Sequence, residues 1–420
     1  ELGVPFDTVQ GLRVTTEQSL RLVKMALNGI ANLRVVRWLV NGGVEAIGLN
    51  GVDLGLVRVE KYELEGVDLG RVGKVVRVQA EKLTPLLEAG LVPVISPISL
   101  GLDGEGVTTY LPTVVTHSMT RHTRVLRTIA EAIETCPDVC RRVPGVHLEG
   151  PYISAEEGPR GAHPLEYCRP PDWDEFQWLQ DAARGTIRIL TMSPEFPGAA
   201  DFIRRVVDSG VLVSLGHTSA TCDQIRAAVD AGAQLSTHLG NGAHAYLHRH
   251  ANYIWQQLAE DRLTATLIAD GHHLPPSVVQ CLVRGKTPER IILISDITSI
   301  AGGEAARPGV YQHASLGHVE ILADGRAVVA GQREFLAGAT QPLHVGVVNV
   351  MRMAGVPLAA AIEMASTRPA RLLGLPGDGL VPGGPADVIQ FKLPPGDGGL
   401  QILATVKAGQ CVYGSPWGDA

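Results

Sequence analysis

The sequence lacks any apolar run that approaches the roughly 20 residues needed to cross a membrane. It also has no basic segment followed by an apolar core, the pattern of a cleavable signal. Because the chain begins with Glu1 and not with Met, we expect its natural start to lie upstream. These observations predict a cytoplasmic protein that has no membrane partner.

Basic residues are in short supply as well. Asp and Glu total 43 against 36 Lys and Arg, so the formal net charge is -7. The densest basic patch is Arg121, Arg124 and Arg127, whose helical spacing indicates a solvated helix face. This balance argues against nucleic acid or an anionic membrane surface as a partner.

Cysteine is scarce, with 6 in 420 residues. Cys136 and Cys140 lie four apart, but no second pair completes a zinc knuckle. We interpret the cysteines as reduced thiols of a cytoplasmic enzyme. The length and a hydrophobic content of 45% allow two or three domains with a sizeable core.

From about residue 107 the chain repeats an apolar run followed by an amphipathic stretch. The predicted strands are 107–115, 145–149, 187–192, 210–216, 233–238, 264–269 and 290–295, and the clearest predicted helices are 118–135, 199–209, 222–232 and 275–284. Continuous apolar runs are typical of buried parallel strands, so the pattern predicts a βα repeat. Seven such strands, with polar chemistry at their C-terminal ends, indicate a (β/α)8 barrel in an α/β protein. The eighth strand is not found.

The remaining parts of the chain have other patterns of apolar and polar residues. We expect the barrel to span 107–374, with a β insertion near 304–340 and a helical stretch at 341–374. Residues 375–420 are predicted to form strands of a small β-sandwich. Residues 1–106 are predicted to be a separate α/β segment, which ends in a turn-rich stretch that forms a natural boundary. Within it we expect helices at 16–30 and 80–89, strands at 44–50 and 91–98, and a polar segment at 51–80.

Four polar residues end successive barrel strands. Glu149, His217 and His238 would supply three metal ligands and leave an open position, which is typical of a catalytic zinc site. Asp296 ends the last strand and could take a proton from water and pass it to a leaving amine. The alternatives are that Glu149 is an ion-pair partner and that Asp296 caps the next helix.

Further polar residues follow the same strand ends. His163, Asn241 and His273 are expected on loops at the top of the barrel, where they would make a polar pocket. Arg249 would suit an anionic group of the substrate, because a guanidinium binds phosphate with two hydrogen bonds.

Over residues 107–420 these motifs resemble the N-acetylglucosamine-6-phosphate deacetylase family of the amidohydrolase superfamily. The matching segments are Thr108 to Thr113, His147-Leu148-Glu149-Gly150-Pro151, Gly161-Ala162-His163, Gly216-His217-Thr218, Thr237-His238-Leu239 with Asn241, Ala269-Asp270-Gly271 with His273, Ser295-Asp296, Leu336-Ala337-Gly338, Ala365 to Ala370 and Gly384 to Asp387. The resemblance covers about three quarters of the chain, and the motif set is specific.

The resemblance implies hydrolysis of the acetamide of an N-acetylated amino sugar, most directly N-acetylglucosamine 6-phosphate to glucosamine 6-phosphate and acetate. It implies one divalent metal, zinc or alternatively iron, on Glu149, His217 and His238, with Asp296 as acid and base. The implied substrate contacts are His163, Asn241, Gly242, Arg249 and His273. In the family the residues matching Arg249 and His273 bind the sugar phosphate, in part across a dimer interface, so a homodimer or higher oligomer is expected.

Three departures from the family pattern fall around the sugar. Residues 240–243 read Gly-Asn-Gly-Ala where the family has Phe-Asn-Ala-Met. Residues 249–252 read Arg-His-Ala-Asn in place of Arg-Glu-Pro-Gly, and Ala339 replaces the Ser of Leu-Ala-Gly-Ser. The hydrolytic residues follow the pattern more closely than the residues expected to select the sugar.

Residues 1–106 resemble an internal piece of N-acetylglutamate kinase, of the amino acid kinase family. The similarity lies in Gly11 to Thr15, Gly42 to Leu49, Val67 to Val76 and Val92 to Ile98, and Arg13 would match a residue that binds the acylamino acid. No Gly-rich segment with a Lys precedes it to hold ATP phosphates, and Val52-Asp53 replaces the family's Lys-Asp. Alternative functions are therefore acylamino-acid binding or phosphorylation by this segment, or a non-catalytic fusion.

Overall fold

The computed structural model describes residues 106–300, 308–313, 315–333, 335–376, 384–394, 396 and 399–414, together with short pieces of the first hundred residues. The chain divides into two compact units, residues 1–100 and 101–420. Among the described residues, no helix is long and apolar enough to span a membrane.

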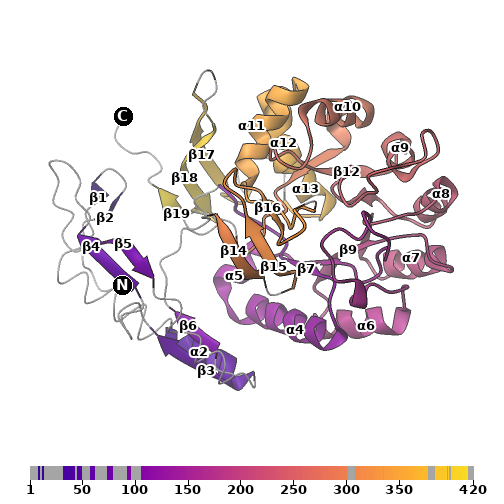
Figure 1. The fold of residues 1–420 in the computed structure, drawn as a ribbon. Coiled ribbons are helices and arrows are strands. Elements are labelled where there is room, and N and C mark those ends of the chain that lie inside the picture. The colour runs from indigo at the N-terminus through magenta and orange to yellow at the C-terminus, as the bar shows by residue number, and fades with distance from the viewer. Residues whose placement is uncertain are drawn as a thin grey trace. The chain divides into compact units, whose positions relative to one another are not determined.

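The second unit is built on a curled sheet of seven parallel strands (Figure 1). In spatial order these are β7 (Thr113–Val115), β8 (Val146–Glu149), β9 (Ile187–Met192), β10 (Leu212–Leu215), β11 (Leu235–Ser236), β12 (Thr264–Ile268) and β13 (Ile291–Ile294). All seven predicted strands are confirmed, and they form one curled parallel sheet. The first is shorter than predicted, since Pro112 has no N–H for a ladder and the strand begins after it.

Helices cover the outer face of this sheet, as Figure 1 shows. They are α4 (Met119–Thr135), α5 (Pro137–Arg142), α6 (Trp173–Ala182), α7 (Ala199–Asp208), α8 (Cys222–Asp230), α9 (Tyr253–Ala259), α10 (Pro276–Lys286), α11 (Leu343–Ala354), α12 (Leu358–Ala365) and α13 (Thr367–Leu372). The stretch predicted as helical at 341–374 forms three helices. Gly355 ends α11 in the left-handed conformation, with φ of 70°, and Pro357 precedes α12.

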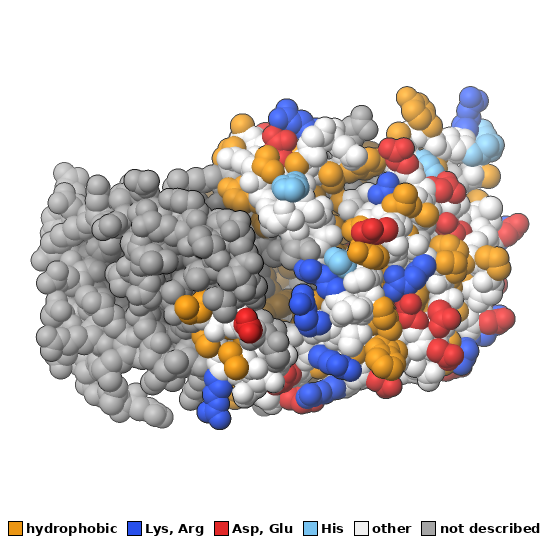
Figure 2. Space-filling model, turned by 60° about the horizontal axis from the view of Figure 1, so that its bottom comes forward, with side chains coloured by type: hydrophobic (Ala, Val, Ile, Leu, Met, Phe, Trp, Pro, Cys, Tyr) orange, Lys and Arg blue, Asp and Glu red, His pale blue; other side chains and the backbone are white. Residues whose placement is uncertain are grey.

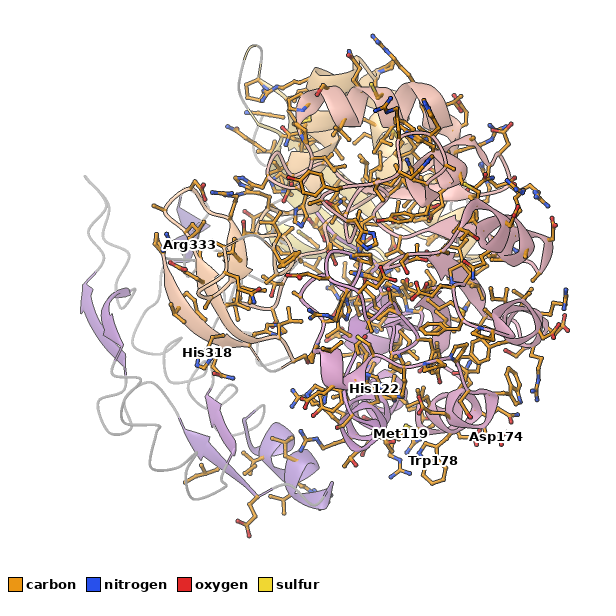
Figure 3. All side chains as sticks on the ribbon, turned by 45° about the vertical axis from the view of Figure 1, so that its right-hand side comes forward. Met119, His122, Asp174, Trp178, His318 and Arg333 are labelled. Atoms are coloured by element: carbon orange, nitrogen blue, oxygen red, sulfur yellow. The ribbon has the colours of Figure 1, made fainter. Side chains whose placement is uncertain are left out.

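Apolar side chains of the helices and strands fill the space between the two layers. Leu126 of α4, Ile203 of α7 and Ile225 of α8 are fully buried in one core cluster with Leu148 and Leu190 of the sheet. Helix α4 is also tied to the sheet by a polar contact. His122 hydrogen-bonds through Nε2 to the carbonyl of Val115 at 2.9 Å, and burial lowers its pKa to about 4, so the ring is neutral (Figure 3 labels His122).

Two antiparallel sheets follow the barrel strands in the last third of the chain. One contains β14 (Gly309–His313), β15 (Gly317–Ile321) and β16 (Ala327–Val329), and the other β17 (Val388–Lys392), β18 (Gln401–Lys407) and β19 (Gln410–Gly414). Lys407 joins the second sheet to the start of the unit, because its Nζ donates to Asp387 at 2.6 Å and to Thr109 at 3.1 Å. On the face in Figure 2, acidic and basic side chains are interspersed.

The first unit contains a parallel pair, β3 (Ala46–Leu49) and β6 (Val92–Ile95), beside α2 (Asn32–Asn41). These strands confirm the two predicted at 44–50 and 91–98. The polar segment 51–80 contains an unpredicted antiparallel pair, β4 (Val57–Lys61) and β5 (Gly73–Val78), and β1 (Thr8–Val9) pairs with β2 (Leu12–Arg13). The helices predicted at 16–30 and 80–89 lie outside the described residues.

Candidate metal centre and active site

The four polar residues predicted to act together lie at the carboxyl ends of the barrel strands. Glu149 is the last residue of β8, while His217, His238 and Asp296 each lie just past the end of β10, β11 and β13. His217, His238 and Asp296 have positive φ angles of 49°, 29° and 50°. Non-glycine residues rarely adopt this conformation, and such strain is concentrated at functional sites.

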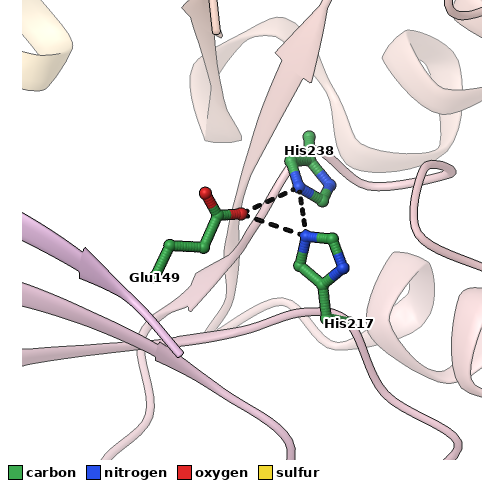
Figure 4. A group of neighbouring side chains, drawn as sticks. All are labelled: Glu149, His217 and His238. Atoms are coloured by element: carbon green, nitrogen blue, oxygen red, sulfur yellow. Dashed lines mark hydrogen bonds and ion pairs between the residues drawn. The ribbon is translucent and has the colours of Figure 1, made fainter. Parts of the chain in front are cut away.

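Glu149, His217 and His238 converge on one point (Figure 4). Oε1 of Glu149 lies 3.0 Å from Nε2 of His217 and 3.2 Å from Nε2 of His238, and the two nitrogens are 3.0 Å apart. Tetrahedral ligands at 2.0–2.2 Å from one zinc ion would be about 3.4 Å apart. The triangle is only a few tenths of an ångström smaller, so these residues fit a single divalent metal.

The protonation of the triad suits a metal. Burial alone would raise the pKa of Glu149, but hydrogen bonds from His217 and His238 hold it well below its usual range, so the carboxylate is charged. Nδ1 of His217 donates to the carbonyl of Pro159 at 2.8 Å, so Nε2 is the nitrogen that faces the centre, and its hydrogen bond to Glu149 would give way to a metal bond. Nδ1 of His238 is buried and has no partner among the described residues.

The imidazole of His217 is held on a second side by glycine. A Cβ built on Gly242 would lie 2.8 Å from Nδ1 of His217, and one on Gly161 would lie 3.4 Å from Cε1. Since Gly242 also has a φ of +55°, a side chain there is disfavoured on two grounds. The predicted substrate residue Gly242 therefore also has a positioning contact with the metal centre.

Replacing Gly242 by Ala should push His217 away from the hydrogen bond with Pro159. Because partners of this kind orient metal ligands, we expect metal affinity to fall by about 10-fold or more. Competition with a chelator measures this directly. Gly355→Ala is the matched control, because Gly355 has a φ of +70° but a Cβ there would meet open space. Equal metal affinity in both variants would contradict the positioning role.

Asp296 lines the same cavity as the triad. Burial raises its pKa, and the nearby carboxylate of Glu149 raises it further. Its backbone carbonyl accepts from Ala339 N–H at 2.8 Å, so the Leu336 to Ala339 segment lies beside it. Among residues 297–300 no helix begins, so the alternative that Asp296 caps a helix is not supported. Among the described residues, the partners of the Glu149 carboxylate are the two imidazoles.

Most of the other predicted site residues line this cavity of about 1820 Å³. They are His163, Asn241, Gly242 and His273. His163 contacts His217 edge-on, with ring centroids 4.4 Å apart, and burial lowers its pKa to about 3. It is therefore a neutral polar group against the metal centre.

Arg249 is the exception among the predicted residues. Its side chain is exposed and does not line the cavity. It lies in a surface loop with Tyr246, whose side chain is 95% exposed. The structure therefore brings eight of the nine predicted site residues to one cavity and leaves Arg249 outside it.

A chain of buried polar side chains, not predicted from the sequence, lies next to the triad. Nε2 of His147 is 2.7 Å from Oγ1 of Thr191, which is 2.7 Å from Oγ1 of Thr237, and Oγ of Ser214 is 2.6 Å from the same Thr237 oxygen. The sequence does contain a signal for His147, because side chains two residues apart on a strand lie on the same face of the sheet. His147 precedes Glu149 by two, so it also had to face the barrel interior.

Comparison with known proteins agrees with this geometry. Among curated proteins, an N-acetylgalactosamine-6-phosphate deacetylase of Escherichia coli O157:H7 is 35% identical over 76% of this chain and 80% of its own length. An N-acetylglucosamine-6-phosphate deacetylase of Homo sapiens is 33% identical over 73% of this chain and 74% of that protein. The crystal structure of N-acetyl-D-glucosamine-6-phosphate deacetylase from Mycobacterium smegmatis has a TM-score of 0.65 and 33% identity, covering 73% of this chain and 77% of that one.

Two family profiles match the chain. The profile of the amino acid kinase family matches residues 1–119, which confirms that the first segment resembles this family. That of the amidohydrolase family matches residues 103–414 and so covers most of the chain. The parallel barrel sheet and the similarity to sugar-phosphate deacetylases agree with this match. The chain therefore belongs to the amidohydrolase family.

Proposed function

We propose that the protein hydrolyses the acetamide of an N-acetylated amino sugar 6-phosphate, converting N-acetylglucosamine 6-phosphate to glucosamine 6-phosphate and acetate. The observation that carries this proposal is the convergence of Glu149, His217 and His238 on one point, with Asp296 in the same cavity. The deacetylases named above support the choice of substrate.

Glu149, His217 and His238 would hold one divalent ion, zinc or alternatively iron. When bound, the ion would supply Lewis acidity toward the amide carbonyl and the attacking water. Asp296 then takes the proton of the water and returns it to the amide nitrogen as the C–N bond breaks. A raised pKa suits a group that must accept and then release a proton.

The identity of the sugar depends on the residues around the cavity rather than on the triad. N-acetylgalactosamine 6-phosphate is a second candidate, because the relative from Escherichia coli O157:H7, at 35% identity, is named for that sugar. The two sugars differ only in the configuration at C4. Comparing kcat/KM for both 6-phosphates therefore tests the choice, and we expect N-acetylglucosamine 6-phosphate to be preferred.

The phosphate contact is proposed to involve His273 and Arg249. Since Arg249 lies outside the cavity of its own chain, we propose that it acts in a homodimer or higher oligomer of a cytoplasmic enzyme. N-acetylglucosamine assayed with and without its 6-phosphate should show a clear preference for the phosphorylated sugar. A charged hydrogen bond is worth about 10- to 100-fold in binding, so Arg249→Ala should reduce that preference by a similar factor.

The control for this prediction is Arg333→Ala, since Arg333 is an exposed arginine that pairs with Glu320 on the small sheet (Figure 3 labels Arg333). It should leave the preference unchanged. The contrary result would be an equal kcat/KM of the wild-type protein for N-acetylglucosamine and its 6-phosphate, with no change in Arg249→Ala. It would show that Arg249 does not bind a phosphate.

For residues 1–119, acylamino-acid binding is the second candidate function, favoured by the match to the amino acid kinase family. Titrations of the full chain with N-acetylglutamate and with ATP separate binding from phosphorylation. We expect no ATP binding, because no phosphate loop was found in the sequence. Saturable ATP binding would contradict this expectation and favour a kinase.

A further inference from the structure

Asp270 and His273 form a tightly held pair just past the end of β12. Oδ1 of Asp270 accepts the backbone N–H groups of His272 at 2.8 Å and of His273 at 2.9 Å. Oδ2 accepts Nδ1–H of the His273 ring at 2.8 Å. The two side chains are 4% and 6% exposed. One buried carboxylate thus accepts all three of these hydrogen bonds, two from the turn and one from the ring.

The turn that carries the pair is fixed from a neighbouring helix. Asn349 of α11 donates through Nδ2 to the carbonyl of Ala269 at 2.8 Å. Gly271 adopts a φ of 88°, which lets the chain reverse between Asp270 and His273. The ring of His273 is therefore placed by a rigid turn and not by a free loop.

This geometry determines which ring nitrogen is available. Because Nδ1 carries the proton donated to Asp270, Nε2 is the nitrogen left for a ligand. It has no hydrogen-bond partner among the described residues, and His273 lines the cavity that contains Asp296 and His238. Burial would raise the pKa of Asp270, but hydrogen bonds from His273 and the turn hold it at about 2, so a negative charge lies behind the ring.

A carboxylate that accepts from Nδ1–H fixes the orientation of the ring, so that Nε2 faces the cavity, where an Nε2–H could donate to an anionic oxygen. We propose that Asp270 is a positioning residue that holds His273 with Nε2 presented to the cavity as the donor to the substrate's phosphate. The substrate in this inference rests on the proposed function.

A simpler role for Asp270 is to stabilise the turn alone, and one substitution separates the two roles. In Asp270→Asn the side-chain oxygen can still accept the two backbone N–H groups. The amide NH2 that replaces Oδ2 cannot accept a proton from Nδ1 of His273. The turn therefore stays while the support of the ring is lost.

With the metal-loaded full chain, Asp270→Asn should raise KM for N-acetylglucosamine 6-phosphate by about 10- to 100-fold, the usual worth of a charged hydrogen bond. The kcat should change little, and kcat/KM for the unphosphorylated sugar should stay the same. Asp324→Asn is the matched control, because Oδ1 of Asp324 also accepts a backbone N–H in a turn, that of Arg326 at 3.1 Å, but supports no ring.

A double-mutant cycle tests the coupling. The amide of His273→Gln can donate from nearly the position of Nε2 without help from Asp270. Adding Asp270→Asn to His273→Gln should therefore have no further effect on KM. Full additivity of the two substitutions, or an equal rise in KM for both sugars, would overturn the proposal.

A third readout does not depend on turnover. The readout is the NMR spectrum of protein with 15N-labelled histidine, in which the His273 signals are assigned from their loss in His273→Gln. Asp270→Asn should shift the signals of both ring nitrogens of His273. Inorganic phosphate should shift the Nε2 signal in wild type but not in Asp270→Asn. If wild type hydrolyses neither sugar phosphate, the proposed function fails, and these signals still decide the role of Asp270. Unchanged nitrogen signals in Asp270→Asn, or no response of wild type to phosphate, would overturn it.

Discussion

His217→Ala is expected to abolish tight metal binding and to lower turnover by about 10³-fold or more, since metal assistance is worth several kcal/mol of barrier. The reason is geometric. His217 supplies one of three ligand atoms that lie 3.0–3.2 Å apart, and its removal leaves two of these ligands for the ion. Metal analysis of the purified variant should give well under one ion per chain, against about one for wild type.

The control is His318→Ala, which removes an exposed histidine on β15 far from the triad in sequence (Figure 3 labels His318). Its metal content and turnover should match those of wild type. If His217→Ala retained one tightly held ion and normal turnover, the triad would not be the metal centre.

Asp296→Asn should separate metal binding from proton transfer. The variant is expected to keep its metal, because Glu149, His217 and His238 are intact. Turnover should fall by about 10²-fold or more, since an amide cannot accept the proton of water. Parallel measurement of metal content and kcat checks both parts.

Asp174→Asn is the control for this substitution, because Asp174 is an exposed aspartate in the first turn of α6 (Figure 3 labels Asp174). It should leave kcat unchanged. Near-normal kcat in Asp296→Asn would remove Asp296 from the mechanism, and loss of metal would show that it is a ligand instead of a base.

The barrel could be predicted from the sequence because its signal is strong and local. Each buried parallel strand is a continuous apolar run, and most are followed by an amphipathic helix. The polar residues that end these runs, from Glu149 to Asp296, could be grouped from the sequence alone, because the carboxyl ends of parallel strands meet on one face.

Other features depend on contacts between distant residues and leave no local pattern. The carbonyl of Pro159 that holds His217, the left-handed backbone at His217 and Asp296, and the exposure of Arg249 are of this kind. The antiparallel pair β4 and β5 lies in the stretch 51–80, for which the sequence predicted only a polar segment. The stability of a strand pair depends on cross-strand partners that a local pattern does not reveal.

The central claim is tested most directly by measuring acetate release from N-acetylglucosamine 6-phosphate. The protein is assayed after a chelator has removed its metal, and again after one equivalent of zinc has been added back. We expect the chelated protein to be inactive. Activity should return with about one ion per chain and yield acetate and glucosamine 6-phosphate in equal amounts. Equal activity with and without metal, or no acetate from this sugar phosphate when the triad is loaded, would contradict the proposed metal-dependent deacetylation.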